Sequence, residues 1–347
     1  MDVWAASTAS VTAASTMLAL PHPSAGTTSS ARPARPVRPA STPADTGLGG
    51  VLPVGAPAAG TVPRGTVPEE TAPGGMASGG PGGWRQVWEL GDDAALAPVF
   101  ASMAGDLVRA AGITPMHRVL DVGAGSGNAA LAAAEAGADV VACDPVSALL
   151  ERGRAVADAR GLSLDWLPAD AQRLPFGAGT FDVVLSCAGV MFAPDQAAAA
   201  RELVRVCRPG GTIAVASWTA DGAMSRLFAL LERYAPARTD GRVAAPTAWG
   251  NPARVRALFA GGDVRRLSTH HRTARLDYGG SPAQWCTLYR AYFAPIIEAY
   301  DRIGPNPKRI AALDNALLRF ATDEYLGPLG GPGRYEFEYL LLLAEPR

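Results

Sequence analysis

One short segment, Val119–Asn128, constrains the fold of this chain more than any other. It reads VLDVGAGSGN, a strand-like apolar run that carries a carboxylate, Asp121, followed by glycines at alternate positions. Glycine has no Cβ, so it permits φ above zero and lets the backbone approach a ligand closely. The segment therefore predicts a tight turn from a strand into a helix, of the kind that cradles nucleotides.

The charge beside this turn indicates which nucleotide fits it. The glycine spacing is G-x-G-x-G, and Asn128 stands where the dinucleotide fingerprint has its third glycine. A pyrophosphate within about 5 Å of Asp121 would cost roughly 3 kcal/mol per like-charge pair at an effective dielectric of ~20. A ligand with an ammonium and a sulfonium would be attracted instead. S-adenosylmethionine is such a ligand.

The next acidic residue, Asp144, follows a second strand-like run, 139–143. It lies 21 positions after Gly123, close to the spacing that crosses one βαβ unit, and its two oxygens can accept both ribose hydroxyls. An acid at this place is shared with NAD-binding folds, and Asp is also a good cap for the following helix. Capping and ribose binding can coexist, so both interpretations stay open.

Later segments continue the alternation of strands and helices. The run 162–167 leads into Asp170 and Ala171, a side-chain acceptor and a backbone N–H that can reach an adenine edge. Further strand-like runs cover 181–187 and 212–218, with a helix-like stretch between them. In such an α/β arrangement, ligands bind at the carboxyl ends of the strands.

Six motifs in this order give residues 117–218 a resemblance to the class I S-adenosylmethionine-dependent methyltransferases, in particular to the small-molecule branch that includes the quinone-biosynthesis type. The motifs are VLDVGAGSGN, CDP, ADAQRLPF, FDVVLS, VMFAPD and RVCRPGGTIAVASW. The resemblance implies a Rossmann-like methyltransferase fold, which is α/β, doubly wound and built on a mostly parallel seven-stranded sheet. It also implies S-adenosylmethionine as cofactor and a small-molecule methyl acceptor.

The resemblance further implies a role for individual residues. Asp121 and the glycine loop (Gly123, Ala124, Gly125 and Gly127) hold the methionyl part, Asp144 the ribose, Pro145 and Val146 one face of adenine, Asp170 and Ala171 its amino edge, and Ser186 the region of the transferable methyl. Each role has a simpler structural alternative: the glycines can be turn residues, Asp144 can cap the following helix, and Asp170 can be an ordinary acidic residue of a loop.

Composition divides the chain at about Trp84. Residues 1–83 are rich in Pro, Ala, Ser, Thr and Gly, contain no Lys and have Trp4 as their single aromatic residue, so we expect a disordered leader. Four Arg balance four acidic residues there, which argues against a nucleic-acid-binding arm. The start Met1-Asp2, with Ser and Thr scattered through the early apolar residues, argues against a secretory signal.

Residues 84–347 suit one methyltransferase domain, with the cofactor-binding core at 117–218. The net charge is −1 and the pI about 6.4, which argue against nucleic acid as a partner. No apolar run reaches the roughly 18 residues of a membrane span, so no stable membrane insertion is expected. Four cysteines without metal-site spacing predict no metal and reduced thiols, and we expect a cytoplasmic protein whose oligomeric state the sequence leaves open.

Two segments are expected on the substrate side of the cleft, 84–112 and a helical insertion, 281–322. The insertion precedes the last strand, and the strands around it, 264–276 and 334–344, form an antiparallel pair. Its first helix carries a stripe of apolar and aromatic residues that is more often core than pocket: Trp285, Leu288, Tyr289, Tyr292, Phe293, Ile296, Ile297 and Tyr300. We hypothesise that some of Tyr289, Tyr292 and Phe293 face an apolar or aromatic acceptor, and that Pro295 kinks or ends the helix.

Methyl transfer asks mainly for positioning, since holding the reactants in line contributes roughly 7 to 11 kcal/mol. A hydroxyl acceptor would need a base, for which His270 and His271 are candidates, although an exposed pair on a strand edge is the simpler interpretation. No other catalytic residue is assigned. Two alternative functions share these motifs in part, namely an NAD-dependent oxidoreductase and a cofactor-binding module without catalysis.

Overall fold

The structure is a computed structural model that describes residues 83–92, 96–236, 246–261, 263–328 and 333–347. The expected leader, 1–83, lies outside these residues except for Gly83. Among the described residues, no helix combines the length and the apolar character needed to cross a bilayer.

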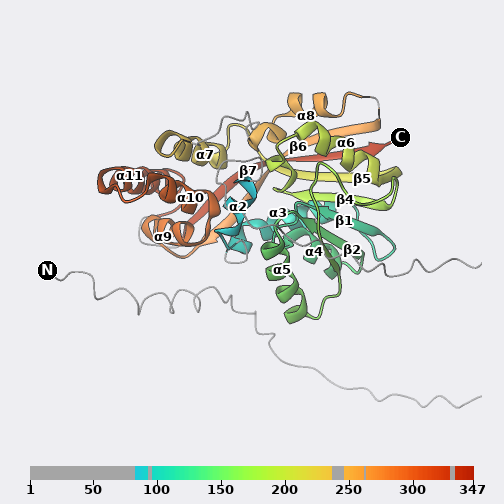
Figure 1. Ribbon diagram of the computed structural model, residues 1–347, viewed down its shortest axis with the longest axis horizontal. Helices are drawn as coiled ribbons and strands as arrows, with labels where there is room; N and C mark the ends of the chain where they lie inside the picture. Colours follow the sequence, from blue (N-terminus) through green and yellow to red (C-terminus); the bar gives the residue numbers. More distant parts are fainter. Residues whose placement is uncertain (1–82, 93–95, 237–245, 262, 329–332) are drawn as a thin grey trace, which may run out of the picture. The chain divides into compact units, whose positions relative to one another are not determined.

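A seven-stranded sheet in the order β3-β2-β1-β4-β5-β7-β6 forms the centre of the fold (Figure 1). Its strands are β1 (Arg118–Val122), β2 (Asp139–Asp144), β3 (Asp165–Pro168), β4 (Phe181–Cys187), β5 (Cys207–Trp218), β6 (Val264–Tyr278) and β7 (Gly333–Pro346). The first five strands pair in parallel, and β7 runs antiparallel between β5 and β6. This confirms the predicted α/β fold, with the two antiparallel strands at one end of the sheet.

The central strands are mostly apolar and buried because helices cover both faces of a parallel sheet. In β1, for example, every residue from Val119 to Val122 is buried. The chain order of strands reverses beside β1, whose neighbours are β2 and β4. Ligands of doubly wound sheets bind at such a switch point, outside the carboxyl ends of the strands.

The helices are α2 (Gly83–Glu89), α3 (Ala97–Ala110), α4 (Asn128–Glu135), α5 (Ser147–Arg160), α6 (Gln196–Val206), α7 (Ala223–Tyr234), α8 (Pro252–Leu258), α9 (Pro282–Tyr292), α10 (Ala294–Ile303) and α11 (Pro307–Asp323), with short 3-10 turns η2 (Val190–Phe192) and η3 (Pro246–Gly250). Helices α3 and α4 pack on each other and on the central strands, whereas α6 packs on β4, β5 and α8.

The insertion before the last strand consists of α9, α10 and α11, as predicted. Helix α9 starts with a capping box, in which the Ser281 hydroxyl accepts from the Gln284 N–H and the Gln284 side chain accepts from the Ser281 N–H. It ends at Tyr292, and Pro295 stands in the first turn of α10, so the proline separates two helices. In Figure 1 the three helices gather with α7 beside the start of β7.

The strands β6 and β7 carry this insertion beyond the rest of the sheet. The pairing of β7 with β5 ends at Tyr339 and Trp218, whereas its pairing with β6 continues to Gly333 and Tyr278. We call this two-stranded extension the β6–β7 arm (Thr273–Tyr278 and Gly333–Glu338). Buried Trp285 of α9 packs on the arm, with its ring centroid 5.4 Å from that of Tyr335.

Two sequence predictions differ from the structure. The strand expected at 162–167 is the shorter β3, and the strand expected at 212–218 is the longer β5. The Arg-Pro-Gly-Gly residues 208–211 lie inside β5 as an irregularity of its register with β4, where Gly210 adopts a φ of 71°. In this last case the apolar run and the turn residues belong to one strand, which a local pattern does not reveal.

Candidate functional site

The glycine loop connects β1 to α4 with three left-handed glycines. Gly123, Gly125 and Gly127 have φ values of 66°, 57° and 86°. A Cβ on Gly123 would lie 2.9 Å from the Cα of Gly189, in the loop that follows β4. The loops after β1 and β4 therefore meet backbone to backbone, and only glycine fits at this contact.

Asp121 lies directly beneath the glycine loop and is almost fully buried, with 1% of its surface exposed. Its Oδ2 accepts a hydrogen bond of 2.9 Å from the Ala130 N–H in α4. Its Oδ1 has no hydrogen-bond partner within the described part of the chain. Burial, with a smaller contribution from the nearby charge of Asp144, raises the pKa of Asp121 to about 7. A buried carboxylate oxygen of this kind suits a cationic ligand group.

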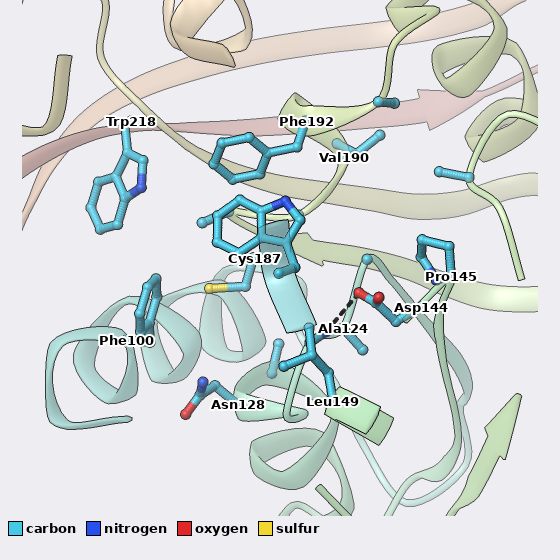
Figure 2. A pocket seen from close by; sticks show the side chains of 18 of the residues that line it. Phe100, Ala124, Asn128, Asp144, Pro145, Leu149, Cys187, Val190, Phe192 and Trp218 are labelled. Atoms are coloured by element: carbon cyan, nitrogen blue, oxygen red, sulfur yellow. Dashed lines mark hydrogen bonds between the residues drawn. The ribbon is translucent and has the colours of Figure 1, made fainter. Parts of the chain in front are cut away.

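Asp144 ends β2 and faces the cavity beside the loop. Its Oδ2 accepts from the Gly125 N–H at 3.0 Å (Figure 2), and its Oδ1 accepts from the Val146 N–H at 2.9 Å, just ahead of α5. Burial raises its pKa to about 6, although both hydrogen bonds and the positive charge of Arg85 oppose the shift. The carboxylate is thus held rigidly where β2 opens into the cavity.

Asp170 follows β3 and makes three polar contacts. Its Oδ1 accepts from the backbone N–H and from the side-chain amide of Gln172, each at 2.9 Å, and its Oδ2 lies 2.6 Å from Nη2 of Arg85. Burial favours the neutral acid, but the hydrogen bonds from Gln172 and Arg85 outweigh it and keep the pKa of Asp170 below its usual value.

These groups surround one cavity at the carboxyl ends of the parallel strands. Figure 2 shows Asp144 and Pro145 on one side of it, Phe100 and Trp218 on the opposite side, and Cys187 and Phe192 between them. We call the ring-bearing part of the wall the aromatic lining, which comprises Trp88, Phe100, Phe192, Trp218, Phe228 and Phe293. The cavity therefore joins a polar side to an aromatic side.

The aromatic lining is assembled from elements far apart in the sequence. Trp88 of α2 and Phe228 of α7 both contact Phe192 edge-on, with centroids 4.6 and 6.1 Å away. Phe228 also lies 6.4 Å from Phe293, at the junction of α9 and α10. A flat apolar molecule would find ring faces and edges here at contact distance.

The structure brings most of the predicted site residues to this cavity, namely Gly123, Ala124, Gly125, Asp144, Pro145, Asp170 and Ala171. Asp121 and the buried Val146 lie behind its wall. Gly127, at the start of α4, packs against the ring of Trp166. Ser186 is fully buried, donates to the Val122 carbonyl at 2.7 Å and accepts from the Val190 N–H at 2.9 Å. Its hydroxyl thereby ties β1 to the turn after β4.

Some cavity residues were not predicted from the sequence. Cys187, Ala188 and Gly189 follow Ser186 directly, and Ala188 has an unusual φ of 52° for a residue other than glycine. Their place at the carboxyl end of the predicted strand 181–187 was the available signal. Phe192 and Trp218 stand within two of the six motifs, and Phe100 lies in the segment 84–112 that was expected on the substrate side, whereas no local signal marks Phe228.

The three ring residues proposed for the insertion lie in different places. Phe293 lines the cavity and Tyr292 is not among its lining residues, whereas Tyr289 is buried and stacks on Trp285 with centroids 3.9 Å apart. The candidate bases, His270 and His271, are exposed on β6 at the edge of the sheet. Neither histidine is among the residues that line the cavity, and their exposed position on an edge strand is the one that the simpler interpretation expected.

The residues present fit S-adenosylmethionine. Asp121, with a buried carboxylate oxygen that has no partner in the described structure, lies under a loop whose Gly123 and Gly125 line the cavity, and Asp144 offers a second carboxylate there. Pro145 and Leu149 supply an apolar surface beside Asp144 (Figure 2). This donor set matches a nucleoside with a cationic tail better than it matches a pyrophosphate.

The chain is similar in sequence to known methyltransferases. A family profile described as a methyltransferase domain matches residues 120–215. The chain is 44% identical over 264 residues to the uncharacterised protein Rv1405c of Mycobacterium tuberculosis, covering 76% of this chain and 94% of that protein. It is 37% identical over 110 residues to the demethylmenaquinone methyltransferase of Beutenbergia cavernae, covering 32% of this chain and 44% of that protein.

Among solved structures, the YcgJ protein of Bacillus subtilis covers 70% of this chain and 97% of its own, at 21% identity and a TM-score of 0.48. The matched domain spans the glycine loop, Asp144, Asp170 and most of β5, so it contains the polar side of the cavity. A methyltransferase therefore accounts for the site, and the nicotinamide alternative loses its support. The chain belongs to the class I S-adenosylmethionine-dependent methyltransferases.

Proposed function

We propose that this protein binds S-adenosylmethionine and transfers its methyl group to a small apolar or aromatic molecule. The observation that carries the proposal is the buried Oδ1 of Asp121, which has no partner in the described structure and lies beneath the glycine loop of the cavity. A neutral or anionic ligand would leave this oxygen uncompensated. A cationic methionyl group would stabilise its charged form.

Each side of the cavity has a separate task in this proposal. Asp144 accepts the ribose hydroxyls, Asp170 and Ala171 contact the adenine edge, and Pro145, with the buried Val146 behind it, lies against the ring. The glycine loop gives backbone N–H groups to the methionyl part. The cofactor supplies a methyl group on a positively charged sulfur, which leaves as a neutral thioether.

The aromatic lining holds the acceptor. Its rings exclude water and restrict a flat molecule to few orientations, so that the nucleophilic atom can be held in line with the methyl group. Titratable side chains among the described cavity residues are few: Asp144, Asp170 and the thiol of Cys187. Burial raises the pKa of this thiol above its usual value, so it stays neutral. Positioning rather than proton transfer is the main contribution that these residues can make.

The binding half of the proposal is tested by isothermal calorimetry with S-adenosylmethionine, S-adenosylhomocysteine and NAD. We expect the first two to bind and NAD to give no heat. Asp144→Ala should weaken S-adenosylmethionine by about 1 to 3 kcal/mol through the loss of charge-assisted hydrogen bonds. Asp165→Ala, an exposed position on the neighbouring β3, is the matched control and should leave affinity unchanged. Binding of NAD alone would refute the proposal.

The catalytic half is tested by transfer of a labelled methyl group to a panel of quinones, phenols and amino compounds. Quinones belong in it because of the demethylmenaquinone methyltransferase that the chain resembles over part of its length. Phe192→Ala should raise the KM for the best acceptor while the affinity for the cofactor stays within about twofold. If no acceptor in a broad panel is methylated, a cofactor-binding module without catalysis is the better description. The proposal includes a cytoplasmic location, which cell fractionation tests.

A further inference from the structure

We propose that Arg85 is the counter-ion of the adenosine side of the cavity, a positioning residue that holds Asp170 and Asp144 ready for a neutral nucleoside. The proposal rests on the proposed function, because it concerns the same cavity. It assigns a specific task to α2, the helix that precedes the matched domain.

The contact that supports it is an ion pair between elements far apart in the chain. Nη2 of Arg85 lies 2.6 Å from Oδ2 of Asp170, and the two side chains are 43% and 26% exposed. The same guanidinium acts on Asp144 through its charge. Within the described part of the cavity wall there is no Lys or Arg, although three carboxylates lie in or behind it. Arg85 reaches this acidic region from α2.

The two sides of the proposed cofactor place different demands on these carboxylates. The methionyl end brings positive charge to Asp121. Ribose and adenine are neutral, so they cover Asp144 and Asp170 and exclude water without adding a charge. A carboxylate that loses water in this way needs a hydrogen-bonded cation to remain ionised at low cost. Arg85 meets that need on the adenosine side.

The placement of α2 does not depend on this ion pair alone. The Asp92 N–H donates to the Tyr292 carbonyl at 2.9 Å, and the guanidinium of Arg152 in α5 donates to the Gly91 carbonyl. Trp88, one turn after Arg85, packs edge-on against Phe192. A change of Arg85 should therefore leave the helix in place and remove only the charge.

The test compares S-adenosylmethionine, S-adenosylhomocysteine and adenosine by calorimetry on the full chain and on Arg85→Gln, Arg85→Lys and Arg160→Gln. Arg160 is the control, because its pair with Glu135 joins α5 to the end of α4 and both side chains are half exposed. We expect Arg85→Gln to weaken all three ligands by about tenfold. Arg85→Lys should recover most of the affinity, and Arg160→Gln should match the unmodified chain.

A pH series supplies a readout that a purely structural role would not move. The positive charge of Arg85 lowers the pKa of Asp144. Without the guanidinium, Asp144 keeps its proton up to a higher pH. As the pH is lowered, adenosine affinity should therefore begin to fall at a higher pH in Arg85→Gln than in the unmodified chain. The proposal is overturned if Arg85→Gln binds normally, if only S-adenosylmethionine is weakened, or if Lys fails to restore what Gln removes. Failure of the unmodified chain to bind any of the three ligands would instead overturn the proposed function.

Discussion

At the scale of single residues, Asp121 and Asp144 share a buried setting that makes ligand binding sensitive to pH. A cation is attracted only to the ionised acids, whose pKa values lie at about 7 and about 6. Affinity for S-adenosylmethionine should therefore fall as the pH drops below 7, by about tenfold for each pH unit per carboxyl that must ionise. Calorimetry from pH 5.5 to 8.5 checks this, and Asp121→Asn should abolish the step near pH 7. A flat profile would contradict the role of Asp121.

The raised pKa values of Asp121 and Asp144 predict the opposite pH dependence for the stability of the ligand-free protein. Their pKa values in the folded state are raised above the usual value of 3.8, so between about pH 4 and 7 the folded chain binds more protons than the unfolded chain. Stability should thus decrease as the pH rises through this window. Urea unfolding at pH 5 and pH 8 measures the difference. In Asp121→Asn the decrease should be smaller, because the amide does not titrate.

Ser186 illustrates how a motif residue can have a structural task. Its hydroxyl bridges the Val122 carbonyl and the Val190 N–H in a fully buried place. Ser186→Ala should lower the free energy of unfolding by about 1 to 3 kcal/mol, because it leaves a buried N–H without a partner. Urea denaturation measures the loss. If stability is unchanged and only methyl transfer suffers, the residue acts at the methyl group, as the resemblance implies.

At the scale of elements, the loops after β1 and β4 depend on each other. A Cβ on Gly189 would collide with the Gly123 carbonyl, so Gly189→Ala should push the two loops apart. We expect a loss of about 1 to 3 kcal/mol in unfolding free energy together with weaker cofactor binding. Gly279→Ala is the matched control, because a Cβ there meets nothing within 4 Å. Equal behaviour of the two variants in urea denaturation and calorimetry would show that the loops are independent.

At the scale of the whole molecule, the sequence predicts the polar side of the cavity much better than the aromatic side. Asp121 lies one residue before the end of β1, Asp144 ends β2 and Asp170 follows β3, so local patterns place them near one another. Phe100 and Phe228 reach the cavity from helices outside the matched domain, and only tertiary packing brings them together. The apolar stripe in α9 has the period of a helix, but this period does not distinguish Tyr289 in the core from Phe293 at the cavity.

We expect a substitution in the insertion to change stability and methyl transfer without changing the affinity for S-adenosylmethionine. Trp285 is fully buried and stacks on Tyr289, between α9 and the β6–β7 arm. Trp285→Ala should cost about 3 to 5 kcal/mol in unfolding free energy, because it leaves a cavity in this cluster. Affinity for S-adenosylmethionine at low temperature should stay within about twofold, whereas methyl transfer falls. A parallel loss of cofactor affinity, measured by calorimetry, would show that the two regions are not separable.

The β6–β7 arm has a mechanical consequence. Since the register of β7 with β6 continues past the last residue of β5, helices α9 to α11 are mounted on a narrow ribbon instead of the broad sheet. Ribbons of two strands twist more than wide sheets do. We therefore expect a rotation of this ribbon about its long axis to shift Phe293 relative to Trp218 and so to change the width of the aromatic side of the cavity.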